Sequence, residues 1–157
     1  MAKTKIKGNQ LLIELGGGKL GCLTSISYNL EREIIEASCR EEGNFTGGSK
    51  GRLSGSIDFD GLMIIDNPAV PTNVRSGDLM DMMLDDSDTE VSYVFGPGNS
   101  TGGDTESLGA PGDITGSKVL TGTAILSSLS YSGDQDGEAT YSGSLTLTSK
   151  PTHAAAV

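Results

Sequence analysis

Few residues in this sequence have the types and spacing that catalysis requires. A Ser/His/Asp set needs a histidine held between a nucleophile and a carboxylate, and the single histidine, His153, lies four residues from the C-terminus. Residues 98–102 match the Gly-x-Ser-x-Gly pattern of a hydrolase nucleophile, a motif that requires a strand before it and a helix after it. Here the match falls within a long glycine-rich stretch, so we interpret it as coincidental and expect no catalytic site.

Patterns typical of cofactor and metal sites are also incomplete. Residues 16–21 match the Gly-x-Gly-x-x-Gly fingerprint, but the residues after them alternate as a strand, whereas the fingerprint needs a helix N-terminus for the phosphate. A hairpin turn explains these glycines better. The acidic stretch 134–138 lacks the later glutamate of an EF-hand loop, and Cys22 and Cys39 are too few for a disulfide framework or a four-ligand zinc site. We therefore expect no cofactor and no metal.

The charge balance limits the partners of the chain. Lys and Arg number 11 against 21 Asp and Glu, which gives a net charge of −10. Proteins that grip DNA neutralise its phosphates with Lys and Arg, whereas a surface of the same sign as DNA keeps it from adhering. The longest apolar runs, such as residues 62–65, fall far short of the ~20 residues that cross a bilayer, so we expect no membrane insertion. The N-terminal residues also lack the apolar core of a secretory signal, which predicts synthesis in the cytosol.

Apolar and polar residues alternate along five stretches, which is the period-two pattern of half-buried strands. Leu23 is a misfit in the first of them. One segment, residues 76–84, instead places its apolar side chains on one helical stripe, with Ser76 suited to cap the helix. The predicted strands cover residues 20–30, 53–59, 91–95, 121–131 and 139–148.

Glycine-rich stretches separate these elements. Residues 41–51 and 96–118 are expected to be long loops, and residues 132–138 have the composition of a hairpin turn. The length suits one domain, which we place at residues 1–150 and follow with a flexible tail at 151–157. The sequence therefore predicts a mainly β domain with antiparallel strands, one short helix and long glycine-rich loops.

The order of these elements resembles the major tail tube proteins of long-tailed bacteriophages. Within residues 24–62, a strand pair is followed by a glycine-bearing loop and a strand that ends in Asp60-Gly61-Leu62. The helix 76–84 and the strand 91–95 form the second similar stretch. The third is the terminal hairpin, residues 122–145, with its acidic turn. Together the three stretches cover roughly residues 20–148.

The resemblance implies a β-sandwich with barrel-like antiparallel sheets and one flanking helix. It further implies homo-oligomeric assembly into hexameric rings that stack into a hollow tube in the tail of the virion. Such a tube surrounds the tape-measure protein, ends at tail-tip and terminator proteins, and later lets DNA pass without binding it specifically. Assembly would take place in the cytoplasm of the host bacterium.

Two sets of residues are candidates for these roles. An acidic channel would let DNA slide, and the alternating strands offer four carboxylates for it: Glu31, Glu33, Asp58 and Asp60. The glycine-bearing loop, together with residues 96–118, is a candidate for contacts between rings. Its residues are Gly43, Phe45, Gly47, Gly48 and Lys50.

Two alternatives remain open at this point. One is the tube protein of a related contractile injection or secretion machine, which shares the expected fold. The other is a monomeric β-sandwich that binds a carbohydrate or a host surface, for which exposed aromatic side chains near loop ends would be expected. The four tyrosines, Tyr28, Tyr93, Tyr131 and Tyr141, instead lie within the strand alternation, where burial explains them.

Overall fold

The computed structural model describes residues 11–16, 18–20, 23–37, 47–63, 73–74, 76–87, 89–100, 108–111 and 117–155. The prediction of a mainly β chain with one short helix is confirmed. The elements are β1 Leu11–Leu15, β2 Gly18–Leu20, β3 Leu23–Ala37, β4 Gly47–Leu62, β5 Asn73–Val74, α1 Ser76–Leu84, β6 Val91–Ser100, β7 Leu108–Pro111, β8 Lys118–Ser132, β9 Thr140–Leu147 and β10 Thr152–Ala155.

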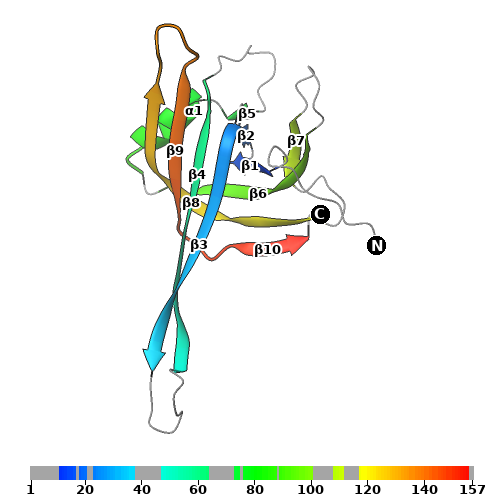
Figure 1. Ribbon diagram of the computed structural model, residues 1–157, viewed down its shortest axis with the longest axis vertical. Helices are drawn as coiled ribbons and strands as arrows, with labels where there is room; N and C mark the ends of the chain where they lie inside the picture. The colour runs from blue at the N-terminus through cyan, green and yellow to red at the C-terminus, as the bar shows by residue number, and fades with distance from the viewer. Residues whose placement is uncertain are drawn as a thin grey trace.

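The strands form one sheet path that folds back on itself as two layers. Its order is β3-β4-β9-β8-β6-β1-β2-β5, with β10 beside β8 and β7 beside β6. Strands β3, β4 and β9 run lengthwise in Figure 1, whereas β6 and β10 run across them. Strand β8 takes part in both layers, because it pairs with β9 along one half and with β6 along the other. A bulge between Leu126 and Ser128 lies where β8 bends, as expected where one strand passes between two layers.

The core lies between the two layers. Tyr28 of β3 and Tyr93 of β6 belong to strands that are not neighbours in the sheet, yet their hydroxyls lie 2.7 Å apart. The ring of Tyr28 also lies 5.1 Å from that of Phe95. The fully buried side chains come from both layers and from the helix, with Leu79 of α1 0% exposed. They include Ile13, Leu15, Ile57, Phe59, Leu79, Tyr93 and Leu145.

Local sequence explains several details of this architecture. Helix α1 forms as predicted, with Asp78 in its first turn, where the helix dipole favours an acidic side chain. The hairpin interpretation of residues 16–21 is confirmed, because β1 and β2 pair as antiparallel strands and Gly16 adopts a φ of 59°. Leu23 no longer breaks the pattern, because a bulge between Leu23 and Ser25 turns it toward the core. Among the described residues, no helix is long and apolar enough to cross a membrane.

The structure corrects three boundaries. Residues 47–51, predicted as loop, belong to β4 and pair with the end of β3. The predicted loop 96–118 contains the end of β6 and all of β7. The predicted tail contains β10, which pairs with β8, so the sheet extends to Ala155. In each case the glycine, serine or alanine content hides a strand, because the backbone hydrogen bonds come from a partner strand that the local composition does not reveal.

Candidate functional site

The residues with catalytic or metal-binding potential that the structure describes do not cluster. Within the described part of the chain, no group of three His, Cys, Asp or Glu side chains is placed to hold a metal ion. His153 is exposed on β10. Ser100, the serine of the Gly-x-Ser-x-Gly match, is the last residue of β6, and residues 101 and 102 lie outside the described residues.

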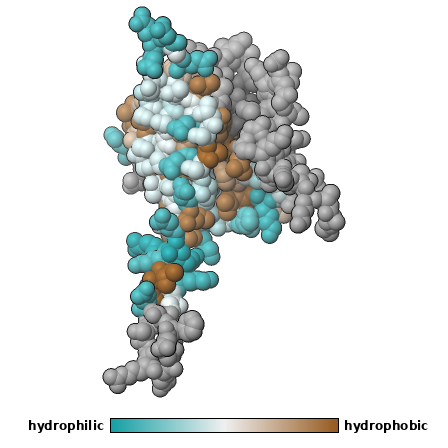
Figure 2. Space-filling model, viewed as in Figure 1, coloured by the Kyte–Doolittle hydropathy of each residue, from teal (hydrophilic) through white to brown (hydrophobic). Residues whose placement is uncertain are grey.

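The most extensive feature is the side of β3, β4, β9 and β8 that faces away from the core, which we call the polar face. The core residues of β4 and β9 occupy one side of the sheet, so the alternate residues Asp58, Asp60, Ser142 and Ser144 share the other side. Strands β3 and β8 extend this face mostly with small polar side chains, and the exposed Ile125 of β8 lies among them. Figure 2 shows it as a pale expanse over β4, β9 and β8 with scattered hydrophilic spots. Its cross-strand neighbours include Ser25, Ser27, Asn29, Ser56, Ser128, Ser130, Thr140 and Thr146.

Hydrogen bonds across the strands satisfy many of these polar groups. Ser25 donates to a carboxylate oxygen of Asp60 at 2.8 Å, and Asn29 donates to Asp58 at 3.3 Å. The hydroxyls of Ser130 and Ser142 lie 2.6 Å apart. Donors on this face are therefore directed at acceptors of the same face, and its formal charge is negative. Such a surface is hydrated and offers little to a phosphate.

Both edges of this four-stranded region carry backbone groups that no described strand pairs. Strand β3 ends the sheet, so its outer edge is open along its whole length. Residues 125–132 of β8 pair with β9 on one side, while β6 occupies the other side only from residue 120 to residue 124. Unpaired strand edges are sites at which another chain adds a strand.

The third feature is a two-stranded arm, which we define as residues 30–37 of β3 and 47–55 of β4. Strand β9 pairs with β4 only from Ser56 onward, so the arm leaves the body as an isolated ribbon (Figure 1). Nine residues of extended β4 project by about 30 Å. Exposed apolar side chains lie on this arm, with Ile34 70% and Ile35 52% exposed. A two-stranded ribbon in water is marginal by itself, so the arm needs a partner to be well packed.

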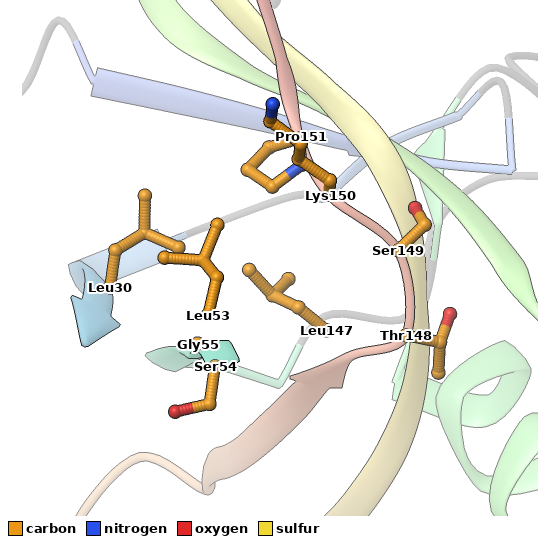
Figure 3. A pocket seen from close by; sticks show the side chains of 9 residues that line it. All are labelled: Leu30, Leu53, Ser54, Gly55, Leu147, Thr148, Ser149, Lys150 and Pro151. Carbon is orange, nitrogen blue, oxygen red and sulfur yellow. The ribbon is translucent and has the colours of Figure 1, made fainter. Parts of the chain in front are cut away.

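A shallow hollow marks the base of the arm. Figure 3 shows Leu30, Leu53 and Leu147 directed toward one another, from β3, β4 and the end of β9. The chain turns away there through residues 148–151 toward β10, and Pro151 forms part of the rim. The residues that line this hollow include one cation, Lys150, and hydroxyl side chains, but no carboxylate and no histidine.

The structure separates the four predicted acidic residues into two pairs. Asp58 and Asp60 lie together on the polar face, both exposed. Glu31 pairs with Ser54, and Glu33 lies at a bulge beside Gly51, so both belong to the first part of the arm. Alternation along β3 places Glu31 on the same side of the sheet as Asp58.

The predicted inter-ring residues fall partly outside the described residues, namely Gly43 and Phe45. Gly47, Gly48 and Lys50 are described, and they are strand residues of the arm, not a loop. Lys50 pairs with Ile34, and Gly48 pairs with Glu36.

Sequence reasoning missed the apolar side chains of the arm and the open edge of β8. The signal for the arm is the stretch 31–36, Glu-Arg-Glu-Ile-Ile-Glu, in which two adjacent isoleucines face opposite sides of a strand. A strand with an apolar residue on each side and charges around them has no single core face. No comparable sequence pattern marks the open edge of β8, because the edge is open only where the neighbouring strand β6 stops pairing with it.

A model of the phage tail tube protein family matches residues 7–153, which is nearly the whole chain. The chain belongs to the phage tail tube protein family. As a tail tube protein, it is a structural component of a virion tail and not an enzyme. The family resemblance expected from the sequence is thereby confirmed.

Solved structures show the same fold at low sequence identity. A chain of the virion of a native gene transfer agent particle is 18% identical, with a TM-score of 0.65 over 95% of this tail tube protein and 98% of that chain. The SPP1 tail tube is 11% identical, with a TM-score of 0.63 over 98% and 81% of the two chains. The tube terminating cap of the anti-feeding prophage is 14% identical, with a TM-score of 0.66 over 99% and 95%. Among curated proteins, none matches the sequence.

Proposed function

We propose that this tail tube protein assembles into hexameric rings that stack as a hollow tube, with the polar face lining the channel. The observation that carries the proposal is a four-stranded polar face bounded by two open strand edges. A face of this kind suits the inside of a closed barrel, because it is polar and its two open edges can be paired by neighbouring copies.

Ring closure follows from the two edges. The outer edge of β3 and residues 125–132 of β8 lie on opposite sides of the same four-stranded region. If β3 of one copy pairs with β8 of the next, every copy contributes the same two edges, and a heterologous contact of this kind forms a closed ring when the rotation allows it. All four strands of each copy then join one continuous barrel.

The charge of the polar face suits a passage for DNA. Six copies of a chain with net charge −10 give −60 per ring. Asp58 and Asp60 would face the channel, and Glu31 and Glu33 would continue this surface toward the next ring. A polyanion is repelled by such a wall and does not stick to it. During assembly the tape-measure protein would occupy the channel, tail-tip and terminator proteins would close its ends, and assembly would proceed in the host cytoplasm.

The arm is suited to contacts between rings. It extends along the same direction as β9 and beyond the end of that strand, and its apolar side chains are exposed. In this proposal the arm residues Gly47, Gly48 and Lys50, with Gly43 and Phe45 beyond them, contact the neighbouring ring.

A second candidate is the tube of a contractile injection system. The similarity to the cap of the anti-feeding prophage and to the sheath/tube terminator of an extracellular contractile injection system favours it. The ring, the barrel and the arm contacts would be the same, and only the cargo would differ.

Electron microscopy of the purified protein tests the assembly directly. Hollow tubes or six-membered rings are expected at high concentration, with light scattering reporting their mass. A cryo-EM map would then show whether Asp58 and Asp60 face the channel. Particles that remain monomeric over the whole concentration range, with or without the partner proteins, would contradict the proposal.

Shortening the arm tests its role between rings. We replace residues 34–50 by an Asn-Gly turn, which preserves β3 and β4 within the body because β9 begins to pair at Ser56. The variant is expected to keep its fold, measured by circular dichroism and thermal unfolding, and to form no long tubes. Tubes of normal length from this variant would show that the arm is not needed for stacking.

A further inference from the structure

Four exposed apolar side chains lie on the two open strand edges of the four-stranded region. Along β3, Leu30 is 43% and Ile35 is 52% exposed. Along the open part of β8, Ile125 is 43% and Tyr131 is 39% exposed. Strands β4 and β9 separate the two edges, and Figure 1 shows β3 and the end of β8 on the two outer sides of the lengthwise strands. The four side chains therefore cannot cover one another within a single copy.

The two side chains of each edge lie on opposite sides of the sheet. In β8, Tyr131 pairs with a buried tyrosine of β9 and lies on the core side, whereas Ile125 pairs with a threonine of the polar face. In β3, Leu30 lies on the core side, where it lines the hollow at the base of the arm. Ile35 follows it by five residues, so alternation places Ile35 on the polar side. Each edge therefore offers one apolar side chain to each side of the sheet.

The spacing of the apolar side chains along the two edges also matches. Ile35 follows Leu30 by five residues in β3. Tyr131 follows Ile125 by six residues, but Ser127 is an extra residue at the bulge, so this stretch of β8 occupies five paired positions. If the two strands of neighbouring copies are antiparallel, a single register places Tyr131 beside Leu30 and Ile125 beside Ile35.

Ring symmetry gives the two strands this antiparallel direction. Strands β3, β4, β9 and β8 are antiparallel in succession, so β3 and β8 of one copy run in opposite directions. All copies of a ring point the same way along its axis, so β8 is also antiparallel to the β3 of the next copy. Strand β6 already pairs with residues 120–124 of β8, which leaves residues 125–132 for the next copy.

The offset between copies in this register agrees with the tilt of strands in closed barrels. Within one copy, the cross-strand row that starts at Asn29 crosses β4 and β9 and reaches β8 at Ile125. In the register described, Ile125 lies beside Ile35 of the next copy, six residues further along β3 than Asn29. Six residues span about 20 Å and four strands about 19 Å, which tilts the strands by about 45° to the ring axis. Barrel strands usually tilt by about 35–45°.

The residues between the apolar pairs are compatible with this register. Residues 125–132 of β8 carry no charge, so the charged residues 31–33 of β3 meet no like charge across the contact. Ile34, which is 70% exposed, comes to lie beside Leu126 on the core side. The register therefore covers a third apolar side chain of β3.

We propose that β8 of one copy pairs with β3 of the next in this register, and that the apolar side chains of the two edges select it. Tyr131 covers Leu30 on the core side, and Ile125 covers Ile35 on the channel side. A shift by two residues keeps every side chain on its own side of the sheet but separates both pairs. The inference rests on the proposed ring closure, and it names the residues that fix how neighbouring copies join.

Disulfide formation between copies measures the register. Ser130→Cys/Glu31→Cys introduces cysteines at directly opposite residues, whose Cβ atoms lie about 4.5–5.5 Å apart, whereas diagonal neighbours lie about 7–8 Å apart. Mild oxidation of the assembled protein is expected to give a ladder of covalent multimers. The matched controls, Ser130→Cys/Asn29→Cys and Ser130→Cys/Glu33→Cys, are shifted by two residues and should give about tenfold less product.

Background cross-linking is measured with two further samples. One is the unchanged chain, which contains Cys22 and Cys39, and the other is Ser130→Cys alone. Within one copy, β4 and β9 lie between the two substituted strands, so a disulfide inside a single chain does not form.

A charge exchange provides a second measurement. Ile125→Asp is expected to raise the protein concentration at which rings form by about tenfold, because a carboxylate then lies against Ile35 at every contact of the ring. Adding Ile35→Lys should recover about fivefold, since opposite charges on facing residues attract and the contacts of a ring multiply. Ile34→Lys is the matched control, because it adds the same charge on the other side of the same strand. Light scattering measures ring formation, and circular dichroism checks that each variant keeps its fold.

The outcomes separate this inference from the proposed function. A ladder confined to Ser130→Cys/Glu31→Cys, with recovery by Ile35→Lys and not by Ile34→Lys, supports the register. Rings whose cross-links appear instead in a shifted pair, or in no pair, overturn it and leave the ring assembly intact. Equal recovery by both lysines overturns the contact between Ile125 and Ile35. A protein that forms neither rings nor tubes at any concentration removes the ring assembly and this inference together.

Discussion

At the residue scale, close packing of aromatic rings over glycines explains part of the high glycine content. Phe59 pairs across the strands with Gly143, and Tyr141 pairs with Gly61. A Cβ atom added at Gly143 would lie 2.7 Å from the Phe59 ring, and one at Gly61 would lie 2.5 Å from the Tyr141 ring. The rings therefore lie flat on the neighbouring strand, a position that any side chain there would block. These glycines are packing residues and not loop residues.

A single methyl group at one of these positions tests this packing. Gly143→Ala is expected to lower the free energy of unfolding by about 1–3 kcal/mol, because the Phe59 ring has to move within a full core. The control is Gly133→Ala, where the nearest atom would lie at an ordinary 3.7 Å and little change is expected. Urea unfolding of the monomer measures both variants, and equal stabilities would contradict the packing argument.

The pair of tyrosines in the core predicts a loss of stability at high pH. Burial and the contact with Tyr93 raise the pKa of Tyr28, and burial raises the pKa of Tyr93. Below pH ~10 both hydroxyls are protonated in the folded and unfolded states, so they add no pH dependence. Above it the unfolded chain ionises first, and stability falls as the pH rises.

Urea unfolding between pH 8 and pH 11.5 measures this loss. Tyr28→Phe/Tyr93→Phe is expected to show a shallower decrease above pH ~10 than the unchanged protein. At pH 8 its free energy of unfolding should differ from that of the unchanged protein by about 1 kcal/mol at most. The change is small because both hydroxyls are removed together and neither is left without a partner. Lysines and the other tyrosines titrate in both proteins, so the difference between the two curves is decisive. Parallel curves would show that the pair does not couple to folding.

At the scale of elements, bulges allow long strands to serve two surfaces. In β8, Leu126 pairs with Leu145 and Ser128 pairs with Ser144, so Ser127 is an extra residue without a cross-strand partner. The bulge keeps Leu126 and Leu129 both directed at the core, although they are three residues apart. A bulge between Arg32 and Ile34 occurs in the arm as well. These irregularities change the bend of a strand without losing its pairing.

Deletion of one serine from each partner strand distinguishes a bulged residue from a paired one. Removing Ser127 is expected to cost about 1 kcal/mol, because its hydroxyl donates to the backbone oxygen of Ser144 at 3.0 Å and pairing can otherwise continue. Removing Ser144 shifts half of β9 by one residue and takes Tyr141 or Leu145 out of the core, which we expect to cost at least ~3 kcal/mol. Thermal unfolding compares the two, and equal losses would contradict the assignment of the bulge.

At the scale of the whole molecule, the chain has two distinct ends and two distinct faces. One face of the four-stranded region is core and the other is polar, while the arm and the β8–β9 turn lie at opposite extremes of the longest axis (Figure 1). A monomer with an exposed arm and open edges leaves apolar side chains and backbone groups uncovered. The features that are unfavourable in the monomer are those that the proposed tube covers.

A charge change on the polar face tests its place in the tube. Tubes of Asp58→Lys are expected to retain short duplex DNA at low salt and protect it from nuclease, because six new cations per ring attract phosphates inside the channel. The matched control is Glu14→Lys on β1, a strand of the other layer of the sandwich. Protection should disappear at high salt. If Glu14→Lys tubes protect DNA equally well, Asp58 does not line the channel.

The sequence by itself determined the strand alternation, the helix at residues 76–84, the hairpin at Gly16 and the resemblance to tail tube proteins. Each depends on neighbouring residues, whose spacing places side chains on one face of an element. For the same reason, alternation along β4 predicts that Asp58 and Asp60 share one side of the strand, where the structure places them.

Only the tertiary structure decided the arm, the strands β7 and β10, the separation of Glu31 and Glu33 from the other carboxylates, and the two open edges. These depend on which strand lies beside which and on where a neighbouring strand ends, and hydrogen bonds between separate strands decide both. Residues 47–50 show this most clearly. Their sequence, Gly-Gly-Ser-Lys, has the composition of a loop, and they are strand because residues 34–37 of β3 supply the missing backbone partners.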